Sequence, residues 1–122
     1  MSNVQQIDSP DQRYYLLLAS YEVRMSHWVT SAALWERRAQ RLLLAIGDGL
    51  WSSETIAWSA DSRVVTVGLR RYLGDAPGIA LDIYPEPQLV IPHAPAETQP
   101  VPFVELNTFL DRYYAQHRRE RS

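Results

Sequence analysis

Alternation between apolar and polar positions divides most of the chain into short strands. Val65, Val67 and Leu69, for example, alternate with Thr66 and Gly68. Clusters of Gly, Pro, Asp and Ser separate such segments and are typical of turns. We predict strands at residues 14–25, 29–36, 40–46, 54–58, 63–71, 79–84 and 88–91. The spacing predicts an antiparallel β-meander of about six to seven strands.

The two ends of the chain depart from this pattern. The first residues are polar and are expected to be disordered. Prolines 92, 95 and 100 predict an extended linker, because proline breaks helices and sheets. Beyond it, Phe103, Leu106, Leu110 and Tyr113 repeat at helical spacing. We therefore predict an α+β fold: a disordered lead-in (1–8), then a single domain (9–122) made of a β-meander (9–91), a Pro-rich linker (92–101) and one C-terminal helix (102–118) packed on the sheet.

Two segments repeat within the predicted meander. Ser9-Pro10-Asp11-Gln12-Arg13 precedes one apolar strand, and Ser59-Ala60-Asp61-Ser62-Arg63 precedes another, at an offset of 50 residues. A second pair of segments, 40–44 and 87–91, has an offset of 47 residues. Residues 31–46 could instead form a helix, because they are rich in Ala, Leu, Glu and Arg. We favour strands there, because the matching residues 79–91 contain two prolines and cannot be helical.

The repeat resembles a known architecture. The resemblance lies in Trp58-Ser59-Ala60-Asp61-Ser62-Arg63 before an apolar strand, and in Leu34-Trp35-Glu36 before a turn and a further strand. Over residues 9–91 the pattern is similar to propeller blades of the WD40 and TolB type. The resemblance implies two blade-like units but no closed propeller, which needs at least four blades. A plain antiparallel meander is the alternative.

Composition narrows the function classes. The chain has 122 residues, of which 46% are hydrophobic, as expected for one globular domain. It has no cysteine, so disulfides, thiolate metal sites and a cysteine nucleophile are excluded. The net charge is -2 and all 12 basic residues are arginine, without the basic face of a nucleic-acid-binding protein. The apolar runs are too short to span a membrane and no signal peptide is recognisable, so we expect a cytoplasmic protein.

Charged and aromatic side chains on otherwise apolar strands are the candidates for a binding surface. Glu22 and Arg24 share a strand face, and Arg70-Arg71-Tyr72 is the densest polar cluster. The arginines could pair with Glu22 or grip an anionic partner. Solvated cross-strand ion pairs are the simpler alternative. The full set of candidates is Glu22, Arg24, His27, Trp28, Arg70, Arg71 and Tyr72.

No catalytic constellation or metal-ligand spacing is recognisable, so we expect neither an enzyme nor a cofactor. We expect a non-enzymatic domain that binds another protein. In size and style the chain resembles the small α+β immunity proteins that bacteria keep beside toxins, which implies an immunity-type or regulatory interaction protein. One alternative is a small-molecule or enzyme pocket between sheet and helix. Another is a self-associating module whose exposed sheet edges are covered in a homo-oligomer.

Overall fold

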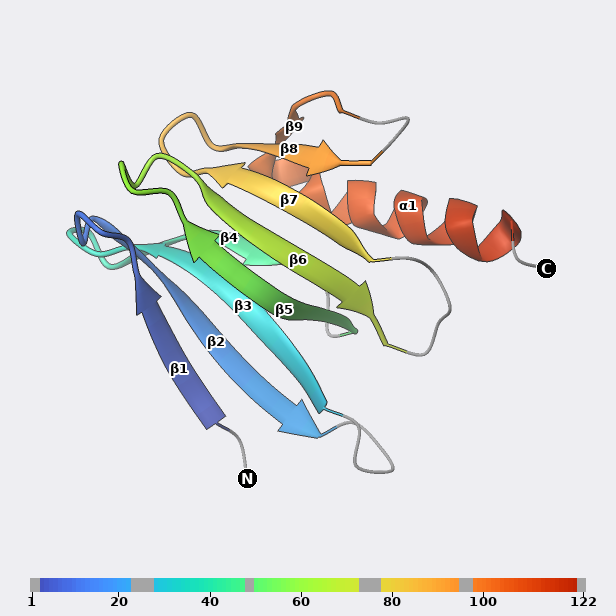
Figure 1. Ribbon diagram of the computed structural model, residues 1–122, viewed down its shortest axis with the longest axis horizontal. Helices are drawn as coiled ribbons and strands as arrows, with labels where there is room; N and C mark the ends of the chain where they lie inside the picture. Colours follow the sequence, from blue (N-terminus) through green and yellow to red (C-terminus); the bar gives the residue numbers. More distant parts are fainter. Residues whose placement is uncertain (1–2, 23–27, 48–49, 73–77, 95–97, 121–122) are drawn as a thin grey trace.

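The computed structural model describes residues 3–22, 28–47, 50–72, 78–94 and 98–120. These residues form two antiparallel sheets and one C-terminal helix (Figure 1). The first sheet consists of β1 (Asn3–Asp8), β2 (Tyr14–Glu22), β3 (Trp28–Glu36) and β4 (Arg41–Ile46). The second consists of β5 (Trp51–Trp58), β6 (Val65–Arg71), β7 (Ile79–Tyr84), β8 (Leu89–His93) and β9 (Val101–Pro102). A 3₁₀ turn, η1 (Phe103–Glu105), leads into helix α1 (Leu106–Glu120).

The α+β class and the C-terminal helix are confirmed, and residues 31–46 are strand rather than helix. The described residues contain nine strands, more than the predicted six to seven. Each sheet is a meander in which every strand pairs with its sequence neighbour. Within the described part of the chain, no helix is long and apolar enough to cross a membrane.

Two segments expected to be irregular contribute the additional strands. The expectation of a disordered lead-in is wrong for residues 3–8, because β1 pairs with β2 along its whole length. Its polar sequence reflects its place at the edge of the sheet, where one side of the strand faces water. The linker is likewise shorter than predicted, since β8 extends through Pro92 and β9 pairs with Leu89 and Val90. Pro92 is tolerated because it lies beyond the two residues that β9 pairs with.

The internal repeat corresponds to two turns with the same hydrogen bonds. In the first turn the Asp11 carboxylate accepts bonds from the Ser9 hydroxyl (2.8 Å) and from the Arg13 backbone N–H (3.0 Å). In the second, Asp61 accepts bonds from Ser59 (2.6 Å) and from the Arg63 backbone N–H (3.1 Å). The offset of 50 residues therefore relates positions with the same backbone environment.

The second repeat offset requires a correction. Gln40 and Gln88 both have a left-handed backbone, with φ of 52° and 58°. These two residues occupy the same place in the β3–β4 and β7–β8 turns, so the offset there is 48 residues rather than 47. The sequence alignment missed it because short apolar segments match at more than one register.

One hydrophobic core joins the two sheets and the helix. The first sheet contributes the even-numbered side of β2, with Leu16 and Leu18 buried, whereas the second contributes the odd-numbered side of β6, with Val65 and Val67 buried. The side chains of α1 and η1 complete this core, namely Phe103, Leu106, Phe109, Leu110 and Tyr113. A contact outside the core also links the sheets, since the Thr30 N–H donates to the Ser52 hydroxyl over 3.0 Å.

Candidate functional site

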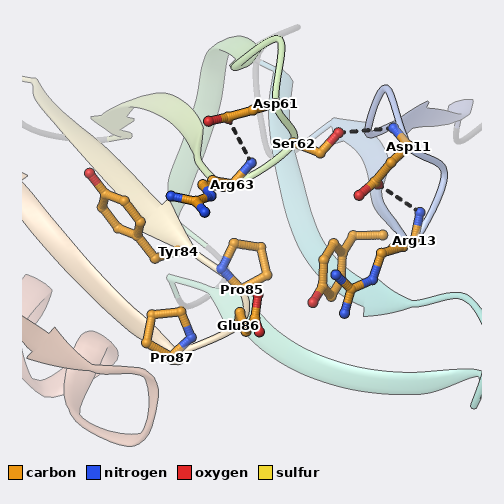
Figure 2. Close-up of a pocket in the computed structure, with 10 residues that line it drawn as sticks. Asp11, Arg13, Asp61, Ser62, Arg63, Tyr84, Pro85, Glu86 and Pro87 are labelled. Carbon is orange, nitrogen blue, oxygen red and sulfur yellow. Dashed lines mark hydrogen bonds between the residues drawn. The ribbon is translucent and has the colours of Figure 1, made fainter.

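The two repeat turns lie side by side at one end of the sheets. The Asp11 backbone N–H in the first turn donates a 2.9 Å hydrogen bond to the Ser62 hydroxyl in the second. The turns line a groove of about 560 Å³, whose third wall is the β7–β8 turn, residues 84–87. Figure 2 shows Pro85 and Glu86 lying between the Arg63 and Arg13 side chains in this groove.

Local hydrogen bonds hold each turn in the same conformation. The Ser9 hydroxyl accepts the Tyr14 backbone N–H over 3.1 Å, and the Ser59 hydroxyl accepts that of Val64 over 3.2 Å. Serine and aspartate favour such turns because their short side chains bond to the nearby backbone. Each turn therefore presents the arginine that follows its aspartate, Arg13 or Arg63, at an equivalent place.

The turn aspartates are held in their charged form. The Arg13 backbone N–H is the main cause of the lowered pKa of Asp11, with the Ser9 and Ser62 hydroxyls adding to it. The Ser59 hydroxyl and then the Arg63 backbone N–H lower the pKa of Asp61. A carboxylate that accepts hydrogen bonds is stabilised in its ionised form. Both aspartates therefore hold their turns in place. Their carboxylate oxygens already accept hydrogen bonds from within the chain.

Among the described residues, the guanidinium groups of Arg13 and Arg63 make no hydrogen bond, although each interacts by charge with the aspartate of its own turn. Arg13 and Arg63 each bond to the turn aspartate through the backbone N–H, not through the guanidinium group. The Arg13 guanidinium lies 5.3 Å from the centre of the Tyr14 ring. The ion pairs between described residues are Asp8–Arg37, Glu36–Arg41 and Asp82–His93, and neither groove arginine takes part in them.

Aromatic and proline side chains form the rest of the wall. Tyr14 is buried and stacks on Trp58, with the ring centres 6.4 Å apart. Tyr84 is half-buried at the end of β7, and Pro87 is exposed. Glu86 adds a third carboxylate to those of the turns. The groove thus combines two guanidinium groups, three carboxylates and a partly apolar wall.

A second groove adjoins the first and shares Arg13 with it. It measures about 650 Å³ and is lined by Gln12, Arg13, Glu36, Arg37, Arg38 and Ala39. Arg37 is fixed there, because its side chain bonds to Asp8 over 2.5 Å and to the Gln12 carbonyl over 2.8 Å. The two grooves together provide an extended surface along the turn end of the molecule.

A further polar network lies on the outer face of the second sheet, and none of its three residues lines the groove. The Thr66 hydroxyl donates to Asp82 over 2.7 Å, and His93 Nε2 lies 2.6 Å from the other Asp82 oxygen. Asp82 lies in the middle of this network, whereas a hydrolytic triad needs histidine there to relay the proton. Among the described residues, no group of three or more His, Asp or Glu side chains could hold a metal ion.

The candidate residues from the sequence lie at the opposite end of the sheets. β2 and β6 end on the same side of the molecule, away from the repeat turns (Figure 1). There Glu22 pairs with Trp28 across β2 and β3, and both are exposed. Arg24 and His27 lie outside the described residues.

Arg70 and Arg71 are the last two residues of β6, and Tyr72 follows them in a turn. Arg70 is exposed, whereas Arg71 packs over the rings of Trp51 (5.8 Å) and Tyr114 (4.4 Å). The Tyr72 N–H donates to the Leu50 carbonyl over 2.8 Å. The residues Glu22, Trp28, Arg70, Arg71 and Tyr72 thus share one end of the fold but belong to two different sheets.

The groove residues were missed although the sequence contained a signal for them. That signal is the Ser-x-Asp-x-Arg repeat, which places Arg13 and Arg63 at equivalent positions of the two turns. Their convergence depends on how the two sheets stack, and no local pattern encodes that.

Comparison with known proteins finds no family model, no curated protein and no solved structure that matches this chain. The resemblances to propeller blades and to immunity proteins therefore stay predictions. Any function proposed for the protein has to rest on the groove and its chemistry.

Proposed function

We propose that the protein is a non-enzymatic binding domain that holds an acidic segment of a partner protein in the groove between its repeat turns. The observation that carries the proposal is the convergence of Arg13 and Arg63 on one groove of about 560 Å³. Each arginine follows the anchoring aspartate of its turn, so the turn hydrogen bonds fix the place from which each side chain starts.

A carboxylate is the ligand group that best matches these arginines. A guanidinium fork bonds a carboxylate through two parallel N–H groups, and such charge-assisted bonds are stronger than neutral ones. The carboxylates of Asp11 and Asp61 accept hydrogen bonds within their own turns and attract the nearby arginines by charge, so the guanidinium N–H groups are available to hydrogen-bond an external acceptor. Glu86, which lies between the arginines in Figure 2, would repel a ligand that is negative along its whole length. It favours a segment whose acidic side chains are spaced apart.

The shape of the site favours an extended segment over a small molecule. The groove is open between three turns, and Arg13 also lines a second groove of about 650 Å³. Tyr84 and Pro87 offer apolar contact to the backbone or to aliphatic side chains of a bound segment. A pocket between sheet and helix has less support, because Phe103, Leu106 and Leu110 fill that space as buried core residues.

The proposal is tested with a fluorescent peptide in which glutamates alternate with serines. We expect binding, measured by fluorescence anisotropy, that weakens as salt is added. Arg13→Ala and Arg63→Ala should each weaken binding by about tenfold, the worth of one charge-assisted hydrogen-bonded contact. Arg70→Ala is the matched control, because Arg70 is an exposed arginine at the opposite end of the sheets.

Two results would overturn the proposal. One is equal binding of a lysine–serine peptide of the same length, which would show that charge does not select the ligand. The other is loss of binding in Arg70→Ala with none in Arg63→Ala, which would move the docking surface to the end that carries Glu22, Trp28 and Arg70.

A further inference from the structure

The second groove at the turn end is built from two turns that are locked together. The Arg37 backbone N–H donates to the Arg13 carbonyl over 2.9 Å. The Arg37 side chain adds hydrogen bonds to the Gln12 carbonyl and to the Asp8 carboxylate. Its guanidinium carbon lies 5.1 Å from the centre of the Tyr15 ring. The turn that follows β3 is therefore fastened to the turn that precedes β2, and the Arg37 side chain is held between them.

The second groove differs from the first in the sign of its charge. Three arginines and one glutamate line the second groove, which gives a net charge of +2. Two arginines and three carboxylates line the first, which gives a net charge of -1. Arg41, Asp8 and Asp11 interact by charge with the lining of the second groove from outside it, and counting them still leaves four arginines against three carboxylates. The second groove is therefore the better place for the strongest negative charge of a bound segment.

The guanidinium groups of this groove match the acceptors of a phosphate. Arg37 donates through Nε and Nη2, so its Nη1 group has no hydrogen-bond partner among the described residues. Arg38 is exposed, and its side chain makes no hydrogen bond or ion pair with another described residue. A phosphate monoester carries a charge of about -1.5 to -2 at pH 7 and has three strong acceptor oxygens, one more than a carboxylate. It can therefore accept hydrogen bonds from several guanidinium groups at once.

We infer that the second groove binds a phosphoserine or phosphothreonine of the same segment whose carboxylates occupy the first groove. The inference rests on the proposed function, and it adds that phosphorylation of the partner raises the affinity. Arg13 lines both grooves, so a segment that passes Arg13 reaches Arg37 and Arg38. A phosphorylated segment fits better than a membrane surface, because none of the exposed large apolar side chains of the described residues lines this groove.

The inference is tested by fluorescence anisotropy on the full chain with three peptides. One is the alternating glutamate–serine peptide, and the other two carry a single phosphoserine, at its first or at its last serine. We expect phosphorylation at one of these ends to strengthen binding by about tenfold, the effect of one further charge-assisted contact. Arg38→Ala should abolish this gain. The gain should also shrink below about pH 6, where the phosphate takes up a second proton.

Three further variants separate the two grooves. Arg63→Ala should weaken all three peptides alike and keep the gain from phosphorylation, because Arg63 lines the first groove and not the second. Glu36→Gln should enlarge the gain, because it removes the carboxylate that lines the second groove. Arg70→Ala is the matched control for Arg38→Ala and should leave the gain unchanged, since Arg70 is an exposed arginine at the opposite end of the sheets. Circular dichroism checks that each variant is folded.

Any of three results would overturn the inference. The first is equal binding of the phosphorylated and unphosphorylated peptides, which would leave the proposed function standing. The second is a gain that persists in Arg38→Ala, which would place the phosphate elsewhere. The third is binding to vesicles that contain a phosphatidylinositol phosphate, lost in Arg38→Ala, with no gain from phosphoserine, which would assign the groove to a membrane surface.

Failure of the proposed function gives a different result. If the unphosphorylated peptide does not bind, the first groove holds no acidic segment. Binding of a phosphorylated peptide that Arg38→Ala abolishes and Arg63→Ala leaves unchanged would still support the phosphate site.

Discussion

The Asp11 backbone N–H donates a hydrogen bond of 2.9 Å to the hydroxyl of Ser62, 51 residues further along the chain. This bond joins the two repeat turns, both of which line the groove. Ser62 is only 4% exposed and has a left-handed backbone with φ of 63°. Gln12, its equivalent in the first turn, has φ of 61° but is exposed. The Ser62 side chain thus joins the two turns, whereas at Gln12 the backbone carbonyl makes the tertiary contact, by accepting a hydrogen bond from the Arg37 side chain.

Glycine at these two positions should have different effects on stability. The left-handed backbone costs an L-residue about 1–2 kcal/mol, which glycine relieves in part after its own entropy cost. We expect Gln12→Gly to raise the free energy of unfolding by about 0.5–1 kcal/mol. The free energy of unfolding should change less favourably in Ser62→Gly, by about 1 kcal/mol relative to Gln12→Gly. The reason is that Ser62→Gly removes the hydroxyl that accepts the Asp11 N–H. Urea unfolding of both variants measures the difference; equal gains would show that the inter-turn bond adds nothing to stability.

The first serine of each turn should also contribute differently to the free energy of unfolding in the two turns. Ser9 is 1% exposed, so Ser9→Ala leaves the buried Tyr14 N–H without its acceptor and should cost about 1–3 kcal/mol. Ser59 is half-buried, and water can replace its hydroxyl at the Val64 N–H. We expect a smaller loss for Ser59→Ala. Urea midpoints that rank the two variants in the reverse order would contradict this account.

Acid should destabilise the protein partly through the two turn aspartates. Hydrogen bonds lower the pKa of Asp11 and Asp61 in the folded state. The unfolded chain then binds more protons as the pH falls below about 4, the ordinary aspartate range. The stabilisation is therefore complete above that pH and is lost as the pH falls through the folded-state values. The double variant Asp11→Asn/Asp61→Asn should lose less of its free energy of unfolding as the pH falls, measured by urea unfolding at several pH values. An unchanged dependence on pH would rule out the two aspartates as the source of the loss.

Gly68 is required by its cross-strand neighbour rather than by backbone conformation. A Cβ atom at this position would lie 2.4 Å from the Thr55 hydroxyl oxygen, on the paired strand β5. Threonine is β-branched and stiff, so it yields little. We expect Gly68→Ala to cost about 1–3 kcal/mol, and Thr55→Ala to remove most of that cost. A double-mutant cycle without coupling between the two sites would show that Thr55 simply rotates away.

Much of the strand order could be predicted from local pattern. Alternation located β6 and β7, because half-buried strands repeat with a period of two. The prolines within residues 79–91 exclude a helix there. Because the repeat matches that segment to residues 31–46, they also predicted strands at 31–46, which the structure confirms. β1 was missed, since an edge strand is held by backbone pairing and needs few apolar residues. Pattern fails where the partner strand, and not the sequence of the segment, supplies the stability.

The candidate site was predictable only in its parts. Each Ser-x-Asp-x-Arg turn bonds to itself, so the sequence determined both turns and the place of Arg13 and Arg63 within them. In β2 both Leu16 and Leu17 are apolar, and alternation cannot say which of them enters the core. Stacking of the two sheets buried Leu16, left Leu17 only partly buried on the other face and brought the turns together. Those outcomes depend on contacts between residues about 50 positions apart, and only the tertiary structure decides them.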